Sequence, residues 1–285
     1  MLGTPLDRMK ITWPIWAIPE PERSPRTDLQ KAWADDGVVI LRNQIPESLL
    51  SAYESRWITD NGGDRAILGQ IETYERPMGY GSFQACLAID ELLEIALCDQ
   101  IQDPVRELLG LSAYPVISLT NWASTELAWH FEQYLFDRSV YGYQVSVWIA
   151  LDEITETSGP FEYFRGSHRW LPPLAPERYP EISVDQVYGL LGLEPFILPI
   201  IEEEIERRGA VPERFLADRG DVLLWHNRLI HRSGRVEGLV ERRSLIFHTQ
   251  AVETKDGKLR AKERPVLRPY GGDDLDRFFS KIGKL

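Results

Sequence analysis

Three residues of this chain have the side chains and the spacing to bind one metal ion. His130 and Glu132 are separated by a single residue, so in an extended strand their side chains point to the same side. His231, far along the chain, would be the third ligand. Two histidines and one carboxylate on one face of an octahedral metal leave other positions open, which is typical of non-haem Fe(II) oxygenases. A His-x-Glu pair is common on protein surfaces, so the prediction depends on the elements and motifs around it.

The overall composition describes an acidic globular protein. The chain has 285 residues, of which 43% are hydrophobic and nine are Trp, so it can bury a substantial core. No break in composition indicates a linker, and we therefore expect one domain over residues 1–285. The formal net charge of −12 argues against a nucleic-acid partner, which would require a basic patch. An anionic small molecule is still compatible with a local basic pocket.

The cysteines and the N-terminus indicate no export and no membrane. Cys86 and Cys98 form no CxxC pair, so we expect two reduced thiols rather than a disulfide. The first residues, Met1–Pro14, lack the pattern of a signal peptide. No apolar run approaches the roughly 18 residues that span a bilayer. We expect a soluble cytoplasmic protein, monomeric or homodimeric.

The N-terminal third combines an irregular arm with helices. Residues 1–26 are rich in Pro and Trp and predict an arm lying on the domain. Thr27 is a suitable N-cap for a helix that ends at Gly37, and a β-branched segment, Val38–Leu41, follows as a strand. Pro46 opens a second helix, and apolar residues at helical spacing predict a third over residues 88–110.

A long segment between these helices, residues 61–85, is rich in Gly and aromatic residues and shows no periodicity. A loop of this length inside a domain is usually functional, so it is interpreted as a lid or pocket wall, with a plain surface excursion as the alternative.

From residue 114 onward the pattern is mainly that of strands. The expected strands cover residues 114–122, 129–134, 143–151, 161–164, 221–225, 242–252 and 259–262. A proline-containing insert over residues 171–218, with a short helix at Ile200–Arg208, separates them and can cover the site. Helices followed by many short strands predict a mainly β fold with flanking helices. A double-sheet jelly roll suits a site built from two distant strands.

The order of several short motifs resembles a known family. These motifs are His130-Phe131-Glu132, Gly159-Pro160, Arg165-Gly166-Ser167-His168-Arg169, Gly220-Asp221, His231-Arg232-Ser233-Gly234 and Arg242-Arg243-Ser244-Leu245. Together they resemble the phytanoyl-CoA dioxygenase family of Fe(II)/2-oxoglutarate-dependent oxygenases, from about Thr27 to about Val252. The resemblance implies a double-stranded β-helix, a form of jelly roll.

The resemblance also implies a role for each candidate ligand. His130 and His231 match the two iron-binding histidines, whereas Glu132 stands where the family usually has aspartate. A glutamate oxygen is still a sound Fe(II) ligand, although its carboxylate lies one methylene further from the backbone. Family halogenases have a small residue at this position, so Glu132 argues against halogenation. His226 is a rival for His231, but its spacing to Arg242 fits the family less well.

The cosubstrate, 2-oxoglutarate, needs a cation for its distal carboxylate, and a forked guanidinium fits a carboxylate better than an ammonium. Arg242 and Arg243 are both candidates. Strand alternation places Arg242 on a polar face with Ser244 and His248, and Arg243 on an apolar face; the family spacing also selects Arg242. Ser233 and Trp148 match family positions beside the cosubstrate.

Candidate substrate contacts are Gln133, Tyr134, Phe136 and His248, for which core or rim packing is the alternative. His168 is interpreted as part of a structural turn. The resemblance implies a dioxygenase that uses Fe(II), O2 and 2-oxoglutarate, releases succinate and CO2, and oxidises a small, partly apolar molecule, for example in secondary metabolism. Hydroxylation is the expected outcome, with desaturation, cyclisation or epoxidation as variants. The competing interpretation is a cupin-type isomerase or binding protein, which would give no reason for Arg242 and Ser233.

Overall fold

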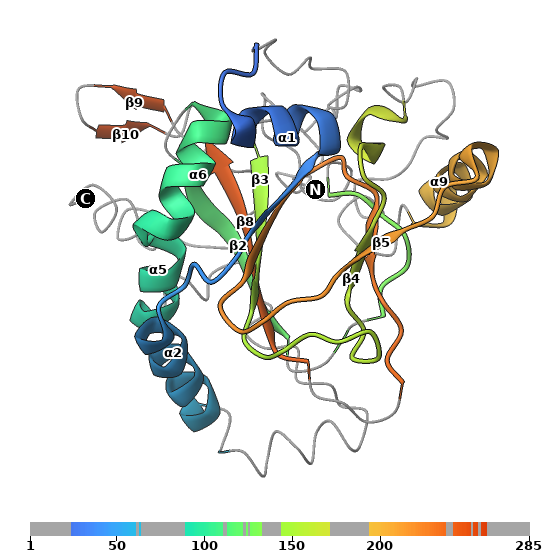
Figure 1. Ribbon diagram of the computed structural model, residues 1–285. Helices are drawn as coiled ribbons and strands as arrows, with labels where there is room; N and C mark the ends of the chain where they lie inside the picture. Colours follow the sequence, from blue (N-terminus) through green and yellow to red (C-terminus); the bar gives the residue numbers. More distant parts are fainter. Residues whose placement is uncertain are drawn as a thin grey trace, which may run out of the picture.

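The computed structural model describes most of the predicted core (Figure 1). The described residues are 24–60, 63, 89–110, 113–121, 124, 126–132, 144–171, 194–237, 242–251, 253–255 and 258–260. Most of the predicted arm, the 61–85 segment apart from Gly63, and residues 172–193 of the predicted insert lie outside the described residues. The expectation of one domain over the whole chain stays a prediction.

The first helix and strand follow the predicted signals closely. Helix α1 (Asp28–Asp36) begins after Thr27, whose hydroxyl accepts a hydrogen bond from the Gln30 backbone N–H at 3.2 Å. The helix ends at Gly37, which has a φ of 70°. A Cβ added at Gly37 would lie 2.3 Å from the His168 ring, so both the turn and the close approach require glycine here. Strand β1 (Val38–Leu41) follows directly.

The prediction of one helix over residues 88–110 is wrong. Two helices, α5 (Asp90–Leu97) and α6 (Asp99–Leu109), meet at Cys98, whose backbone is extended with φ −65° and ψ 149°. The Cys98 carbonyl then accepts the N–H groups of Ile101 and Gln102, which opens α6. Buried apolar residues continue on both sides of the break, which is why periodicity alone predicted one helix. Helix α2 (Glu47–Asp60) begins after Pro46 as expected.

Two antiparallel sheets form the core, and a hairpin extends from it. The large sheet has the order β1-β6-β3-β8-β2 and the small sheet the order β5-β4-β7. Their remaining strands are β2 (Ala113–Asn121), β3 (Gln144–Ala150), β4 (Phe161–Tyr163), β5 (Glu213–Phe215), β6 (Val222–His226), β7 (His231–Ser233) and β8 (Ser244–Ala251). The hairpin pairs β9 (Glu253–Lys255) with β10 (Lys258–Arg260).

The large sheet has two different faces. Its helix face, which carries Val147 and Phe247, packs in one apolar cluster with α2, α5 and α6, the helices seen beside the sheet in Figure 1. Its interior face, which carries Trp148 and Trp225, packs with Phe161 of the small sheet. Two facing antiparallel sheets with flanking helices are the predicted mainly β jelly roll, so this prediction is confirmed.

Three local predictions need correction. The expected strand at 129–134 is, within the described residues, an isolated bridge at His130 followed by a turn at Glu132. The predicted insert 171–218 overlaps the core, because its residues 213–215 form β5. Helix α9 (Glu194–Arg208) starts before the expected Ile200, so Pro199 lies inside the helix and not before it. No described helix is both long and apolar enough to cross a membrane.

Candidate metal centre

The backbone of two distant segments brings the predicted histidines together. The His130 N–H donates to the His231 carbonyl at 3.0 Å, and the His231 N–H donates to the His130 carbonyl at 2.9 Å. Strand β7 is held in turn by β4, where Tyr163 pairs with His231. Phe131 turns away into a separate apolar cluster with Phe164, so the residues on either side of it turn inward. The predicted alternation therefore holds, although the segment is a bridge and not a full strand.

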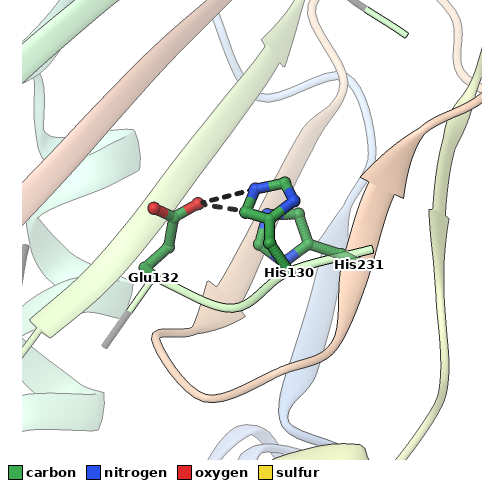
Figure 2. Close-up of side chains that lie close together, drawn as sticks. All are labelled: His130, Glu132 and His231. Carbon is green, nitrogen blue, oxygen red and sulfur yellow. Dashed lines mark hydrogen bonds and ion pairs between the residues drawn. The ribbon is translucent and has the colours of Figure 1, made fainter. Parts of the chain in front are cut away.

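The three predicted ligands form one cluster (Figure 2). One ligand atom from each of His130, Glu132 and His231 lies within 4.8 Å of the other two. Glu132 Oε1 is 3.1 Å from His231 Nε2 and 3.6 Å from His130 Nε2. All three residues are buried, at 3–8% exposure. Within the part of the chain that the structure describes, this is the only such cluster.

Hydrogen bonds fix which ring nitrogens face the cluster. His130 Nδ1 lies 2.8 Å from the Ala128 carbonyl, and His231 Nδ1 lies 2.8 Å from the Leu229 carbonyl. A carbonyl oxygen only accepts, so each Nδ1 carries the proton and donates it. In the neutral rings both Nε2 atoms then present lone pairs, the form in which histidine binds a metal.

The electrostatics of the cluster require a cation. Burial, with a contribution from His130, lowers the pKa of His231 to about 4, so this ring is neutral at neutral pH. Two nitrogen lone pairs and a carboxylate thus converge, and Glu132 Oε2 has no hydrogen-bond partner among the described residues. A divalent metal ion with nitrogen and oxygen ligands fits this donor set.

Aromatic residues that sequence reasoning did not single out enclose the cluster. Phe161 stacks on the His231 ring at 4.9 Å with an interplanar angle of 14°. The Trp225 ring lies edge-on to two histidine rings, with centroid distances of 5.4 Å to His231 and 5.8 Å to His248. Alternation along residues 221–225 could have placed Trp225 on the interior face, but pairing between distant strands was needed to place it against His231.

The rival histidine lies elsewhere. The Arg228 N–H donates to His226 Nδ1 at 3.0 Å, and the His226 ring packs against Trp33 at 5.4 Å and His168 at 4.9 Å. His226 therefore belongs to an aromatic stack beneath α1, outside the three-residue cluster. His168 lies in the same stack and in the turn after β4, as the structural interpretation of its motif expected.

The two predicted cosubstrate residues on the interior face meet each other. The Arg242 guanidinium carbon lies 5.1 Å from the centroid of the Trp148 ring, and both side chains are fully buried. Burial lowers the pKa of Arg242 to about 10. No carboxylate among the described residues neutralises this cation, and Arg242 Nε, Trp148 Nε1 and Ser244 Oγ lack partners there. Arg243 lies on the helix face, where it pairs with Asp152 and Glu54.

The remaining predicted contacts are only partly described. His248 is buried on the interior face, where its Nδ1 lies 2.8 Å from the Ser146 hydroxyl, a partner that sequence reasoning missed. Burial lowers the pKa of His248. Ser233 ends β7, paired with Phe161 and half-buried. Gln133, Tyr134 and Phe136 lie outside the described residues.

The sequence matches a family whose cofactors fit this site. The sequence pattern of the phytanoyl-CoA dioxygenase (PhyH) family matches residues 33–244. The chain belongs to this family. Members of the family depend on Fe(II) and 2-oxoglutarate, so the predicted cofactors are confirmed at the level of the family, and the chain is an oxidoreductase of this class. No curated protein matches the chain.

Solved structures share the fold at low sequence identity. EctD from S. alaskensis with bound Fe is 20% identical, with a TM-score of 0.59 over 90% of this chain and 86% of that one. EctD with 2-oxoglutarate and 5-hydroxyectoine is 18% identical, with a TM-score of 0.57 and coverages of 90% and 86%. The carbocyclase SnoK from nogalamycin biosynthesis is 16% identical, with a TM-score of 0.54 and coverages of 80% and 84%. These likenesses support the jelly-roll fold.

Proposed function

We propose that this protein is an Fe(II)- and 2-oxoglutarate-dependent dioxygenase that oxidises a small, partly apolar organic molecule. His130, Glu132 and His231 would hold the iron. Bound Fe(II), with O2 and 2-oxoglutarate, supplies the oxidising power, and the products of the cosubstrate are succinate and CO2. Hydroxylation is the proposed outcome, with desaturation, cyclisation or epoxidation as variants of the same chemistry.

The observation that carries this proposal is the convergence of three lone-pair donors in a buried site. Both histidines commit Nδ1–H to backbone carbonyls, and Glu132 Oε1 lies 3.1 Å from one Nε2 and 3.6 Å from the other. Without a cation, three acceptors at these separations would repel one another. Bridging them with a metal ion removes the repulsion and uses the lone pairs.

The cosubstrate would use the buried cation of the interior face. Arg242 is 1% exposed and has no acidic partner among the described residues, so an incoming carboxylate would neutralise it. Its guanidinium can form two parallel hydrogen bonds with that carboxylate. Trp148 beneath the guanidinium would fix its plane, and Ser233, two residues after His231, would donate a further hydrogen bond.

The substrate would lie on the remaining side of the cluster. Residues proposed to contact it are Gln133, Tyr134, Phe136 and His248. His248 is desolvated and hydrogen-bonded to Ser146, so it offers a neutral polar group in apolar surroundings. This combination suits a molecule with apolar parts and a hydrogen-bonding group.

Anaerobic titration with Fe(II) and 2-oxoglutarate tests the proposal. We expect a weak visible charge-transfer band when both are present, because the keto-acid end of 2-oxoglutarate would bind the iron. The band should be absent from His231→Ala and retained in His226→Ala, whose ring lies outside the cluster. Metal binding without the band in the unmodified protein would instead favour the cupin-type alternative.

A further inference from the structure

Two consecutive arginines lie on opposite faces of the large sheet. Arg242 is 1% exposed on the interior face, and Arg243 pairs with carboxylates on the helix face. Side chains alternate along a strand, so a slip of one residue would exchange their places. The register of β8, which turns Leu245 and Phe247 to the helix face, sets which arginine faces inward, and contacts at Arg243 can hold that register where the strand begins.

The helix face holds Arg243 through its backbone and its side chain at once. Asp152 accepts the Arg243 backbone N–H at 3.0 Å and the Arg243 Nε–H at 2.7 Å. Glu54 Oε1 lies 3.0 Å from Arg243 Nη1. The Arg243 carbonyl accepts the Leu151 N–H at 3.1 Å. Arg243 is thus fixed immediately before β8 begins, one residue after Arg242.

One of these carboxylates, Glu54, is itself held in place. Glu54 Oε2 accepts a hydrogen bond from Arg219 Nη2 at 2.6 Å, and Arg219 Nε donates to Glu47 at 2.7 Å. Glu54 belongs to α2, and its side chain is only 12% exposed, so it cannot swing away into solvent without breaking this contact. We call Asp152, Glu54 and Arg243 the outer clamp.

The outer clamp also opposes an outward turn of Arg242. Both its carboxylates are engaged by Arg243, so Arg242 would have to displace that arginine to reach them. If Arg243 released these carboxylates, Arg242 would gain by leaving the interior to pair with them, because it has no acidic partner among the described residues and a buried unpaired charge is costly. The interior position of Arg242 is therefore maintained from the other side of the sheet.

We infer that Asp152 and Glu54 are positioning residues, which act through Arg243 to aim Arg242 at the 2-oxoglutarate carboxylate. This inference rests on the proposed function of Arg242. Neither carboxylate would touch the cosubstrate itself, since both lie on the helix face. Their effect should appear in the binding of 2-oxoglutarate and not in the binding of iron.

The test measures the Michaelis constant for 2-oxoglutarate, the iron affinity and the melting temperature in Asp152 variants. Asp152→Ala should raise that constant ~5- to 30-fold, which corresponds to about 1–2 kcal/mol. Iron affinity and kcat at saturating 2-oxoglutarate should stay within about twofold of the wild-type values. The contact with the cosubstrate carboxylate should stabilise the bound ground state and the transition state equally. Asp152→Asn should give a smaller rise, since its amide oxygen can still accept the Arg243 N–H. If Asp152→Ala does not fold, the Michaelis constant for 2-oxoglutarate is measured in Asp152→Asn and in Glu54→Gln instead.

Two further variants make the result specific. Asp36→Asn removes a carboxylate from Arg165, whose Nη1 lies 2.5 Å from Asp36 Oδ2, and should leave the constant unchanged. Adding Asp152→Ala to Arg243→Ala should give no further rise, because Asp152 acts through Arg243. A constant within about twofold of wild type in Asp152→Ala overturns the inference if Arg242→Ala shows a large defect. If Arg242→Ala is also normal, the proposed role of Arg242 is what fails.

Discussion

The two faces of the large sheet satisfy opposite requirements with the same strands. On the helix face, β3 and β8 present Val145, Val147, Leu245 and Phe247, all fully buried in one apolar cluster. On the interior face, the intervening residues include Ser146, Ser244 and His248, equally buried but polar. Alternation along the same strands thus gives an apolar core on one side of the sheet and a buried polar surface on the other.

Charged groups differ between the faces in the same way. On the helix face, Arg243 pairs with Asp152 and with Glu54, and Glu54 also pairs with Arg219, so the four residues form a connected set of ion pairs. On the interior face, Arg242 has no acidic partner among the described residues. A buried charge without a partner lowers stability, so we interpret Arg242 as a residue selected for a functional contact. The comparison predicts that variants on the two faces will fail in different measurements.

The largest effect should come from the metal cluster. His231→Ala removes one of three converging ligands and should abolish Fe(II) binding and turnover, because the site loses a nitrogen ligand that no other residue of the cluster can replace. Metal content after gel filtration, with activity in excess Fe(II), measures this. His226→Ala is the matched control, and it should lower stability through its ring contacts with Trp33 while keeping the iron. Iron lost from His226→Ala but kept in His231→Ala would reverse the assignment.

The next effect concerns Arg242, which has no acidic partner among the described residues. Arg242→Ala should raise the Michaelis constant for 2-oxoglutarate by roughly 30-fold to several thousand-fold, since losing one partner of a buried charged pair costs about 2–5 kcal/mol. Arg242→Lys should recover part of the affinity, because an ammonium cannot reproduce the guanidinium fork or its packing over Trp148. Iron content, measured separately, should be normal in both. An unchanged constant in Arg242→Ala would show that another group binds the distal carboxylate.

Local signals in the sequence were enough to predict much of this molecule. The Thr27 cap, the turn at Gly37 and the strand after it depend on neighbouring residues, and each appears as expected. The alternation around Arg242 also separates the two arginines onto the predicted faces. No local pattern shows that His130, Glu132 and His231 lie close together. This long-range contact could be predicted only from the resemblance to a family.

What the sequence did not reveal depends on contacts between distant segments. The break at Cys98 leaves the apolar spacing unchanged, and three-residue strands such as Glu213–Phe215 are too short to show alternation. The role of Asp152 depends on its approach to Arg243 across the sheet, and the enclosure of His231 by Phe161 depends on pairing of β4 with β7. Neither follows from spacing within a single element.

The smallest effects separate the two faces most directly, through one atom removed from each. Ile149→Val deletes one methyl group from the closed helix face and should lower the free energy of unfolding by about 0.5–1.5 kcal/mol. Ser244→Ala deletes a hydroxyl that is fully buried and has no hydrogen-bond partner among the described residues. Removing such a group relieves an unsatisfied polar atom, so the unfolding free energy should stay level or rise by up to about 1 kcal/mol.

Urea unfolding of the metal-free protein, with chelator present and no 2-oxoglutarate, measures both changes under the same conditions. The two changes in unfolding free energy differ because of packing. Ile149→Val loses contacts that nothing replaces, whereas Ser244→Ala loses only a buried oxygen that has no hydrogen-bond partner among the described residues. If Ser244→Ala destabilises the protein as much as Ile149→Val does, the hydroxyl is hydrogen-bonded in the folded protein. Ser244 would then be an ordinary hydrogen-bonded core residue. Only Arg242 and the metal cluster would still distinguish the interior from the helix face.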